Sequence, residues 1–176
     1  MGKSELIQDP RFSTNGNRVK HSNLVDEIVT AAIEEDAHGI AVSSYQGGHV
    51  EFYRYMLDRL KAQGRESIRV FGGGGGVILP TEIEELHKYG ITRIYSPDDG
   101  RALGLQGMIN DMLSKCDFAT GQNLNGEVKH LKEKDVKSIA RLISAAENNH
   151  SEFSKQFDAE KSKAKTSPVL GITGTG

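Results

Sequence analysis

Short apolar segments alternate with amphipathic segments along the middle of this chain, and this alternation constrains the fold more than any other feature. Three runs of five residues are predicted to be strands, at 40–44, 67–71 and 91–95, and the first of them is apolar on both faces, as a buried parallel strand is. Segments between and beside them carry apolar residues three or four positions apart, which predicts helices at about 24–38, 49–62, 80–89 and 102–114. In the last of these, Leu105, Ile109 and Met112 are expected to face inward. Alternating strands and helices predict a doubly wound α/β fold, with a parallel sheet between helices.

The two ends of the chain differ from this central part. Residues 1–17 are polar and contain Asp9-Pro10 and Asn15-Gly16, both turn signals, so we expect a poorly ordered segment there and a domain over 18–118. Residues 119–167 are mostly polar, with one amphipathic helix predicted at 133–147, and form an expected helical linker. Residues 168–176 are predicted to form a further apolar strand that enters a glycine turn.

Composition argues against several classes of function. The 22 Lys and Arg against 24 Asp and Glu give a formal net charge of −2, which does not favour nucleic acid as the main partner. No segment approaches the roughly 18 apolar residues of a membrane span, and residues 1–12 lack the apolar core of a secretory signal. A single cysteine cannot form an internal disulfide, so we expect a reducing, cytoplasmic environment.

The loops that follow the three predicted strands are chemically unusual. They read SSYQGGH at 43–49, GGGGGVILP at 72–80 and SPDDG at 96–100, and a parallel sheet brings such loops to the edge where ligands bind. The five consecutive glycines could form a flexible linker, but a linker seldom starts at the end of an apolar strand and leads directly into an amphipathic helix. Residues without Cβ instead let the backbone approach a bulky ligand and offer N–H groups to it.

Several other residues have structural explanations that compete with a functional one. His49 could contact a ligand, but the spacing favours a role in capping the following helix, and Tyr45 suits packing at a strand end. Asp98 and Asp99 more often close a turn than bind a metal, because no further carboxylates or histidines recur at ligand spacing. Cys116 has no nearby histidine or basic pair that would make it a nucleophile.

Two nucleotide-binding patterns are incomplete. The run at 72–76 matches a dinucleotide fingerprint only trivially, and no acidic residue ends the following strand to bind a ribose. Residues 171–176 could begin a phosphate-binding loop, but the lysine and hydroxyl that hold phosphate and magnesium are absent from the chain. A GTPase is therefore disfavoured.

Taken together, the three loops resemble the cobalamin-binding domain of adenosylcobalamin-dependent acyl-CoA mutases, the methylmalonyl-CoA mutase family. The similarity runs from about Val25 to Gly176. It is clearest to the fused mutases that act on isobutyryl-CoA, in which a linker, a P-loop G-protein domain and an acyl-CoA-binding barrel follow this domain. Residues 168–176 look like the start of that G-protein domain. The resemblance implies a flavodoxin-like (Rossmann-like) fold with adenosylcobalamin at the carboxyl edge of the sheet.

The family's binding motifs map onto residues of this sequence. Its S-x-L motif corresponds to Ser43, Ser44 and Tyr45, where Ser43 would hydrogen-bond the buried dimethylbenzimidazole tail and Tyr45 replaces the usual leucine. Its glycine pair aligns with Gly75-Gly76 when read back from Val77, or with Gly72-Gly73 when read forward from the strand. The cofactor-binding residues implied are Ser43, Ser44, Tyr45, Gly47, His49, Gly72, Gly73, Gly75, Gly76, Ser96 and Pro97.

One motif of the family is missing. The motif D-x-H-x-x-G supplies the histidine that replaces the tail base as the lower cobalt ligand, and it does not occur in this sequence. No catalytic or metal-ligating residue is therefore assigned. The family's first strand and helix are also missing or replaced by residues 1–17, so the resemblance implies a domain truncated at both ends. We expect weak cobalamin binding without histidine ligation, and an exposed sheet edge that favours association between copies.

The resemblance also implies a reaction. The parent protein would convert isobutyryl-CoA to n-butyryl-CoA by a radical carbon-skeleton rearrangement, and this chain would supply the adenosylcobalamin-binding region. Its partners would be cobalamin and the mutase and G-protein domains of the parent, and the chain alone would be inactive. The alternative is a noncatalytic flavodoxin-like interaction or regulatory fragment that binds no corrinoid.

Overall fold

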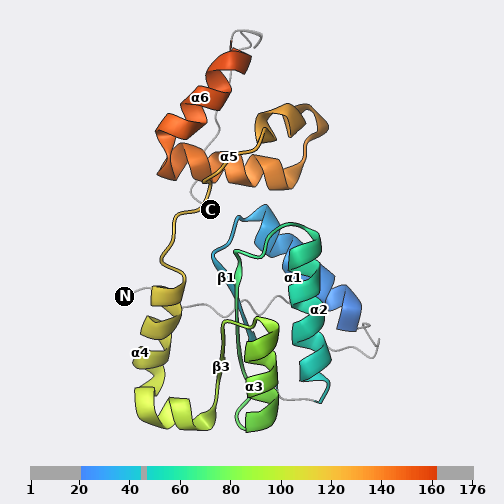
Figure 1. The fold of residues 1–176 in the computed structure, drawn as a ribbon, viewed down its shortest axis with the longest axis vertical. Coiled ribbons are helices and arrows are strands. Elements are labelled where there is room, and N and C mark those ends of the chain that lie inside the picture. The colour runs from blue at the N-terminus through green and yellow to red at the C-terminus, as the bar shows by residue number, and fades with distance from the viewer. Residues whose placement is uncertain (1–20, 45–46, 162–176) are drawn as a thin grey trace, which may run out of the picture.

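A three-stranded parallel sheet flanked by helices forms the centre of the computed structural model, which describes residues 21–44 and 47–161 (Figure 1). The strands lie side by side in the order β1-β2-β3. In chain order, the elements are α1 (His21–Glu34), β1 (Gly39–Ser43), α2 (His49–Ala62), β2 (Arg69–Gly73), α3 (Pro80–Tyr89), β3 (Arg93–Tyr95) and α4 (Pro97–Lys115). This arrangement confirms the predicted flavodoxin-like α/β fold.

The pairing register sorts the strand residues onto two faces of the sheet. Val42, Gly72 and Ile94 are aligned across the three strands, and this row faces the core beneath α1, α2 and α3. The next row points to the opposite face, because neighbouring residues of a strand alternate in direction. It consists of Ser43, Gly73 and Tyr95. Tyr95 contacts α4 from this face, so the sheet has helices on both sides.

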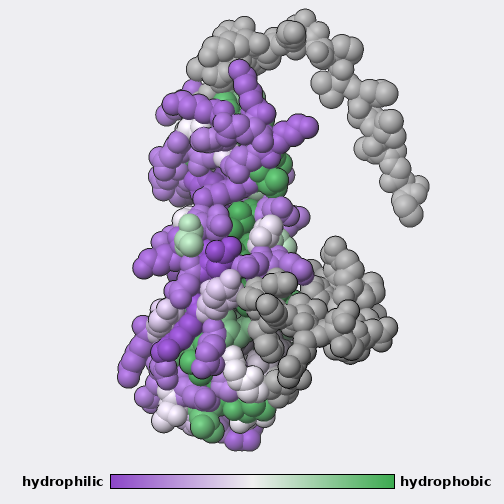
Figure 2. Space-filling view, turned by 90° about the vertical axis from the view of Figure 1, so that its right-hand side faces the viewer, coloured by the Kyte–Doolittle hydropathy of each residue, from purple (hydrophilic) through white to green (hydrophobic). Residues whose placement is uncertain are grey.

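The main core lies between the sheet and the first three helices. Its largest fully buried side chains include Tyr53, Met56 and Leu60 of α2 and Leu86 of α3, each at most 1% exposed. Val25 and other apolar residues of α1 pack against the same cluster, as the three- and four-residue spacing predicts. Seen from the side of α1 and α2, the outer surface is mostly hydrophilic (Figure 2).

Among the element boundaries that differ from the prediction, those of β2 and α4 change the candidate site. β2 continues through Gly72 and Gly73, which the sequence placed in the loop, because these residues pair in register with β1 and β3. α4 begins at Pro97, so the predicted loop at 96–100 is largely helical. Ser96 caps this helix by accepting the Asp99 N–H, while Asp99 accepts the Ser96 N–H.

The predicted orientation of the fourth helix is wrong. α4 contains no buried residue, and Leu105 is 72% exposed. The helix is kinked at Gly104, whose φ of 64° and ψ of 175° are not helical. The kink breaks the helical phase, so residues spaced for one face in the sequence do not share a face in space. The first helix also ends before 38, at Glu34, and Asp36 takes a left-handed φ of 45°.

A second, smaller cluster follows the sheet. It is built from the 3₁₀ helix η2 (Glu127–Glu133), α5 (Val136–Asn148) and α6 (His150–Lys161), so the mostly polar segment after 150 is helical as well. Its buried core contains Leu124, Val128, Leu142 and Ala145. The predicted segments at 1–17 and 168–176 lie outside the described residues. Among the helices that the structure describes, none is both long and apolar enough to cross a membrane.

Candidate functional site

The carboxyl ends of the three strands bring the predicted loops to one edge of the sheet. The Ser44 N–H donates to the Gly73 carbonyl at 2.8 Å, which joins the first loop to the second. A Cβ added at Gly76 would lie 3.3 Å from Pro97 Cγ, so the second loop also lies against the third. Tyr45, which the sequence placed in the same site, lies outside the described residues.

Four of the five consecutive glycines are explained by the fold itself. A Cβ on Gly72 would lie 2.3 Å from the Tyr53 hydroxyl, and one on Gly74 would lie 2.3 Å from the Ser44 carbonyl oxygen. Gly75 and Gly76 have φ values of 56° and 95°, which glycine adopts without strain. The fold therefore favours glycine at these four positions whether or not a ligand is present.

Gly73 is the member of the run that internal packing does not explain. Its φ is not left-handed, and among the residues that the structure describes an added Cβ would meet only the Tyr95 carbonyl oxygen, at an ordinary distance of 3.6 Å. Gly73 is half-buried, and Ser43 beside it on β1 is exposed. We call Ser43, Gly73 and Tyr95 the Ser43 row. This row presents a hydroxyl, bare backbone and an aromatic side chain on the α4 face of the sheet.

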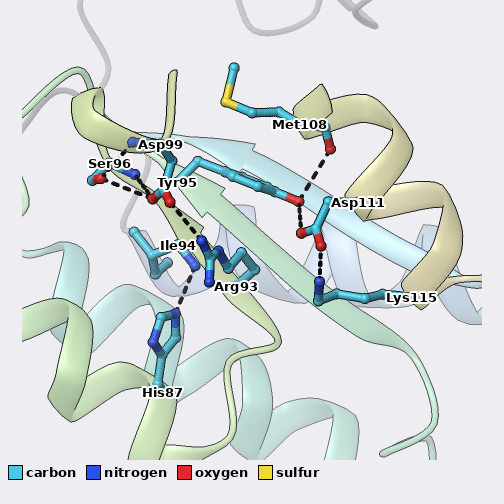
Figure 3. A network of polar contacts seen from close by, with 9 residues as sticks. All are labelled: His87, Arg93, Ile94, Tyr95, Ser96, Asp99, Met108, Asp111 and Lys115. Atoms are coloured by element: carbon cyan, nitrogen blue, oxygen red, sulfur yellow. Dashed lines mark hydrogen bonds and ion pairs between the residues drawn. The ribbon is translucent and has the colours of Figure 1, made fainter. Parts of the chain in front are cut away.

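A polar network fixes Tyr95 between the sheet and α4 (Figure 3). The Tyr95 hydroxyl donates to the Asp111 carboxylate at 2.8 Å, and Lys115 pairs with the same carboxylate. Burial and the neighbouring Asp111 charge raise the pKa of Tyr95 well above its usual value, so the hydroxyl remains a neutral donor. Sequence reasoning gave Tyr95 no role, because only the strand register places it beside Gly73.

The third predicted loop serves mainly to start α4. Arg93 lies 2.6 Å from one Asp99 carboxylate oxygen, and the Ser96 hydroxyl donates to the other at 2.9 Å. Burial alone would raise the pKa of Asp99, but hydrogen bonds from Ser96 and the Arg93 charge outweigh it and lower that pKa. The Ser96 hydroxyl is therefore used in capping, with Pro97 in the first helical turn.

His49 is a packed residue at the start of α2. Its side chain is only 6% exposed, and its Nε2 lies 3.0 Å from Glu82 Oε2 in the first turn of α3. The Leu79 N–H donates to the same Glu82 oxygen at 2.7 Å. Of the other residues in this loop, Gly47 is exposed, and an added Cβ would contact none of the described residues within 4 Å. Sequence reasoning missed Glu82, although its place two residues after Pro80 is a recognisable capping signal.

His87 makes the support of β3 dependent on pH. The Ile94 N–H donates to His87 Nε2 at 3.0 Å, which requires a neutral imidazole (Figure 3). Burial and the nearby Arg93 charge lower the pKa of His87. The folded state therefore binds a proton at His87 less well than the unfolded state does. The stabilisation of the folded state by neutral His87 is complete above the usual histidine pKa of about 6.5 and declines as the pH falls below it.

We expect His87→Leu to lower the free energy of unfolding by about 1 kcal/mol at pH 7.5, through the lost hydrogen bond. The variant should also lose less stability than the wild type when the pH falls to 5. Urea denaturation at both pH values measures this, with the exposed His130→Gln as the control. Equal pH dependence in wild type and His87→Leu would contradict the assignment.

Comparison with known proteins identifies the family. No family model matches the chain. A fused isobutyryl-CoA mutase of Geobacillus kaustophilus is 56% identical over 164 residues, which cover 89% of this chain and 15% of the relative. The corresponding protein of Cupriavidus metallidurans is 51% identical over 158 residues, covering 89% of this chain and 14% of the relative.

More distant relatives match a shorter part. The methylmalonyl-CoA mutase of Escherichia coli is 38% identical over 72 residues, which cover 41% of this chain and 10% of that enzyme. The chain spans about 15% of the length of the first of the fused relatives that it matches. The chain belongs to the methylmalonyl-CoA mutase family and is similar to one segment of the fused isobutyryl-CoA mutases.

Proposed function

We propose that this chain is the cobalamin-binding region of an acyl-CoA mutase, and that the Ser43 row receives the nucleotide tail of adenosylcobalamin. The similarity to fused isobutyryl-CoA mutases supports the acyl-CoA mutase part of this proposal. The observation that supports a bound cofactor is made at Gly73, because neither its backbone angle nor the described atoms around it require glycine. A side chain there would fill the space that a flat ring needs to lie against the strand.

The residues of the Ser43 row suit the base at the end of that tail. The Ser43 hydroxyl, exposed at the end of β1, is a donor suited to a ring nitrogen. Gly73 allows the ring to lie against backbone, and Tyr95, held by Asp111, supplies a rigid aromatic neighbour. When bound, adenosylcobalamin supplies the radical chemistry, and these residues hold and orient it.

The parent reaction and its partners form part of the same proposal. The names of the fused relatives support a mutase that acts on isobutyryl-CoA, and we propose n-butyryl-CoA as its product. The thioester site and the G-protein domain would lie in other parts of the parent, so this chain would be inactive alone. Within it, residues 18–118 would bind the cofactor, 119–167 would form a linker and 168–176 would begin the next domain, in a cytoplasmic protein.

A titration with two corrinoids tests the proposal. We expect the visible absorption of adenosylcobalamin to change saturably with added protein. Cobinamide, which lacks the nucleotide tail, should bind at least about tenfold more weakly if the tail is what the site receives. Absence of saturation would favour the alternative of an interaction fragment that binds no corrinoid, and equal affinity for cobinamide would exclude a tail site. A histidine-ligated cobalt spectrum would contradict the expected absence of a protein ligand.

A further inference from the structure

One carboxylate oxygen joins the far ends of two loops of the site. Glu82 Oε2 accepts the Leu79 N–H at 2.7 Å and lies 3.0 Å from His49 Nε2. Leu79 ends the loop that leaves β2 at Gly73, and His49 begins α2 directly after the loop that leaves β1 at Ser43. Beside the strands, the two loops are already joined by the hydrogen bond from Ser44 to Gly73.

We propose that Glu82 is a positioning residue that fixes the spacing of these two loops and thereby sets the affinity for the cofactor tail. This inference rests on the proposed function. His49 is almost fully buried, so the first loop cannot shift at this point without repacking of the start of α2. Through Glu82, the end of the glycine loop is held against this fixed point.

Glu82 is suited to this role at neutral pH. The Leu79 N–H and then His49 lower the pKa of its carboxyl group, so the group is ionised and accepts both contacts. Other contacts join the same two helices further from the site. Arg54 pairs with Glu85, and the Tyr89 hydroxyl donates to Asp58 at 2.9 Å. Loss of Glu82 should therefore loosen the loops and leave α2 packed against α3.

Substitutions at Glu82 and Glu85 separate positioning from general stability. We expect Glu82→Leu to weaken adenosylcobalamin binding about tenfold, whereas Glu82→Gln, whose amide oxygen can accept both hydrogen bonds, should stay within about threefold of wild type. Glu85→Leu, which removes the ion pair with Arg54 between α2 and α3, should not change binding. Cobinamide binding should be the same in all these proteins, because it has no tail.

Amide hydrogen exchange provides a readout that needs no cofactor. The Val77 N–H donates to the Gly74 carbonyl at 3.0 Å within the glycine loop. We expect its exchange to be at least about tenfold faster in Glu82→Leu and unchanged in Glu85→Leu. Unchanged Val77 exchange, or unchanged adenosylcobalamin affinity in folded Glu82→Leu, would overturn the positioning role. Failure of the wild type to bind cobalamin, with the exchange result as expected, would overturn only the proposed function.

Discussion

Gly73→Val is expected to weaken adenosylcobalamin binding by at least about 100-fold and to leave the free energy of unfolding within about 0.5 kcal/mol of wild type. Within residues 21–44 and 47–161, the added Cβ meets only the Tyr95 carbonyl oxygen, at 3.6 Å, so this part of the fold can accept it. Valine also suits a strand better than glycine does. Its methyl groups would fill the space over the strand where the proposed site places the tail base. Visible-absorption titration measures the affinity, and urea denaturation measures the stability.

A second substitution on the same face controls for this prediction. Ala41 lies on β1, two residues before Ser43, and is exposed on the same face of the sheet. Ala41→Val adds a similar volume two residues further from the carboxyl edge, and we expect it to retain binding. Wild-type affinity in folded Gly73→Val would exclude the Ser43 row as the tail site. Equal losses of affinity in both variants would show that added volume anywhere on this face of the sheet weakens binding, and not specifically volume at Gly73.

Much of the fold follows from local signals in the sequence. The predicted helices at about 49–62 and 80–89 coincide with α2 and α3, because Gly48, Gly64, Pro80 and Gly90 mark their ends. α4 was not predictable in the same way. Its apolar residues keep helical spacing in the sequence, but Gly104 turns the chain out of the helix between Leu103 and Leu105. A backbone conformation at one glycine thus determines what the helix presents to the sheet.

The sequence predicts that the site lies at the carboxyl edge of the sheet, but it does not predict which residues contact one another there. The sequence alone allows the family's glycine pair to be either Gly72-Gly73 or Gly75-Gly76. The first pair lies in β2 and the second lies in the loop after it. Only the strand register shows that Gly73 lies beside Ser43, whereas Gly75 and Gly76 form the turn beyond the strand. Tyr95 and Glu82 were missed for the same reason, since both act across elements that are distant in the sequence.

The opposite face of the same strand gives the largest expected loss of stability. Gly72→Ala places a Cβ 2.3 Å from the Tyr53 hydroxyl and 2.5 Å from Ile94 Cδ1. Tyr53 is 0% exposed, and its hydroxyl donates to the Val42 carbonyl at 3.1 Å, so the ring cannot yield without breaking this bond. Overpacking and the lost hydrogen bond together should lower the free energy of unfolding by about 3 kcal/mol. Urea denaturation with an unchanged m value measures this loss.

A double-mutant cycle identifies the source of that loss. Tyr53→Leu removes both the hydroxyl and the ring carbon that lies 2.7 Å from the added Cβ. In this background, Gly72→Ala should cost less than about 1 kcal/mol, because most of the clash is gone, which gives a coupling energy of about 2 kcal/mol. Additive losses would instead place the cost of Gly72→Ala elsewhere, in the strand backbone or against Ile94. Set beside Gly73→Val, the cycle tests whether adjacent glycines of one strand serve the fold on one face and a ligand on the other.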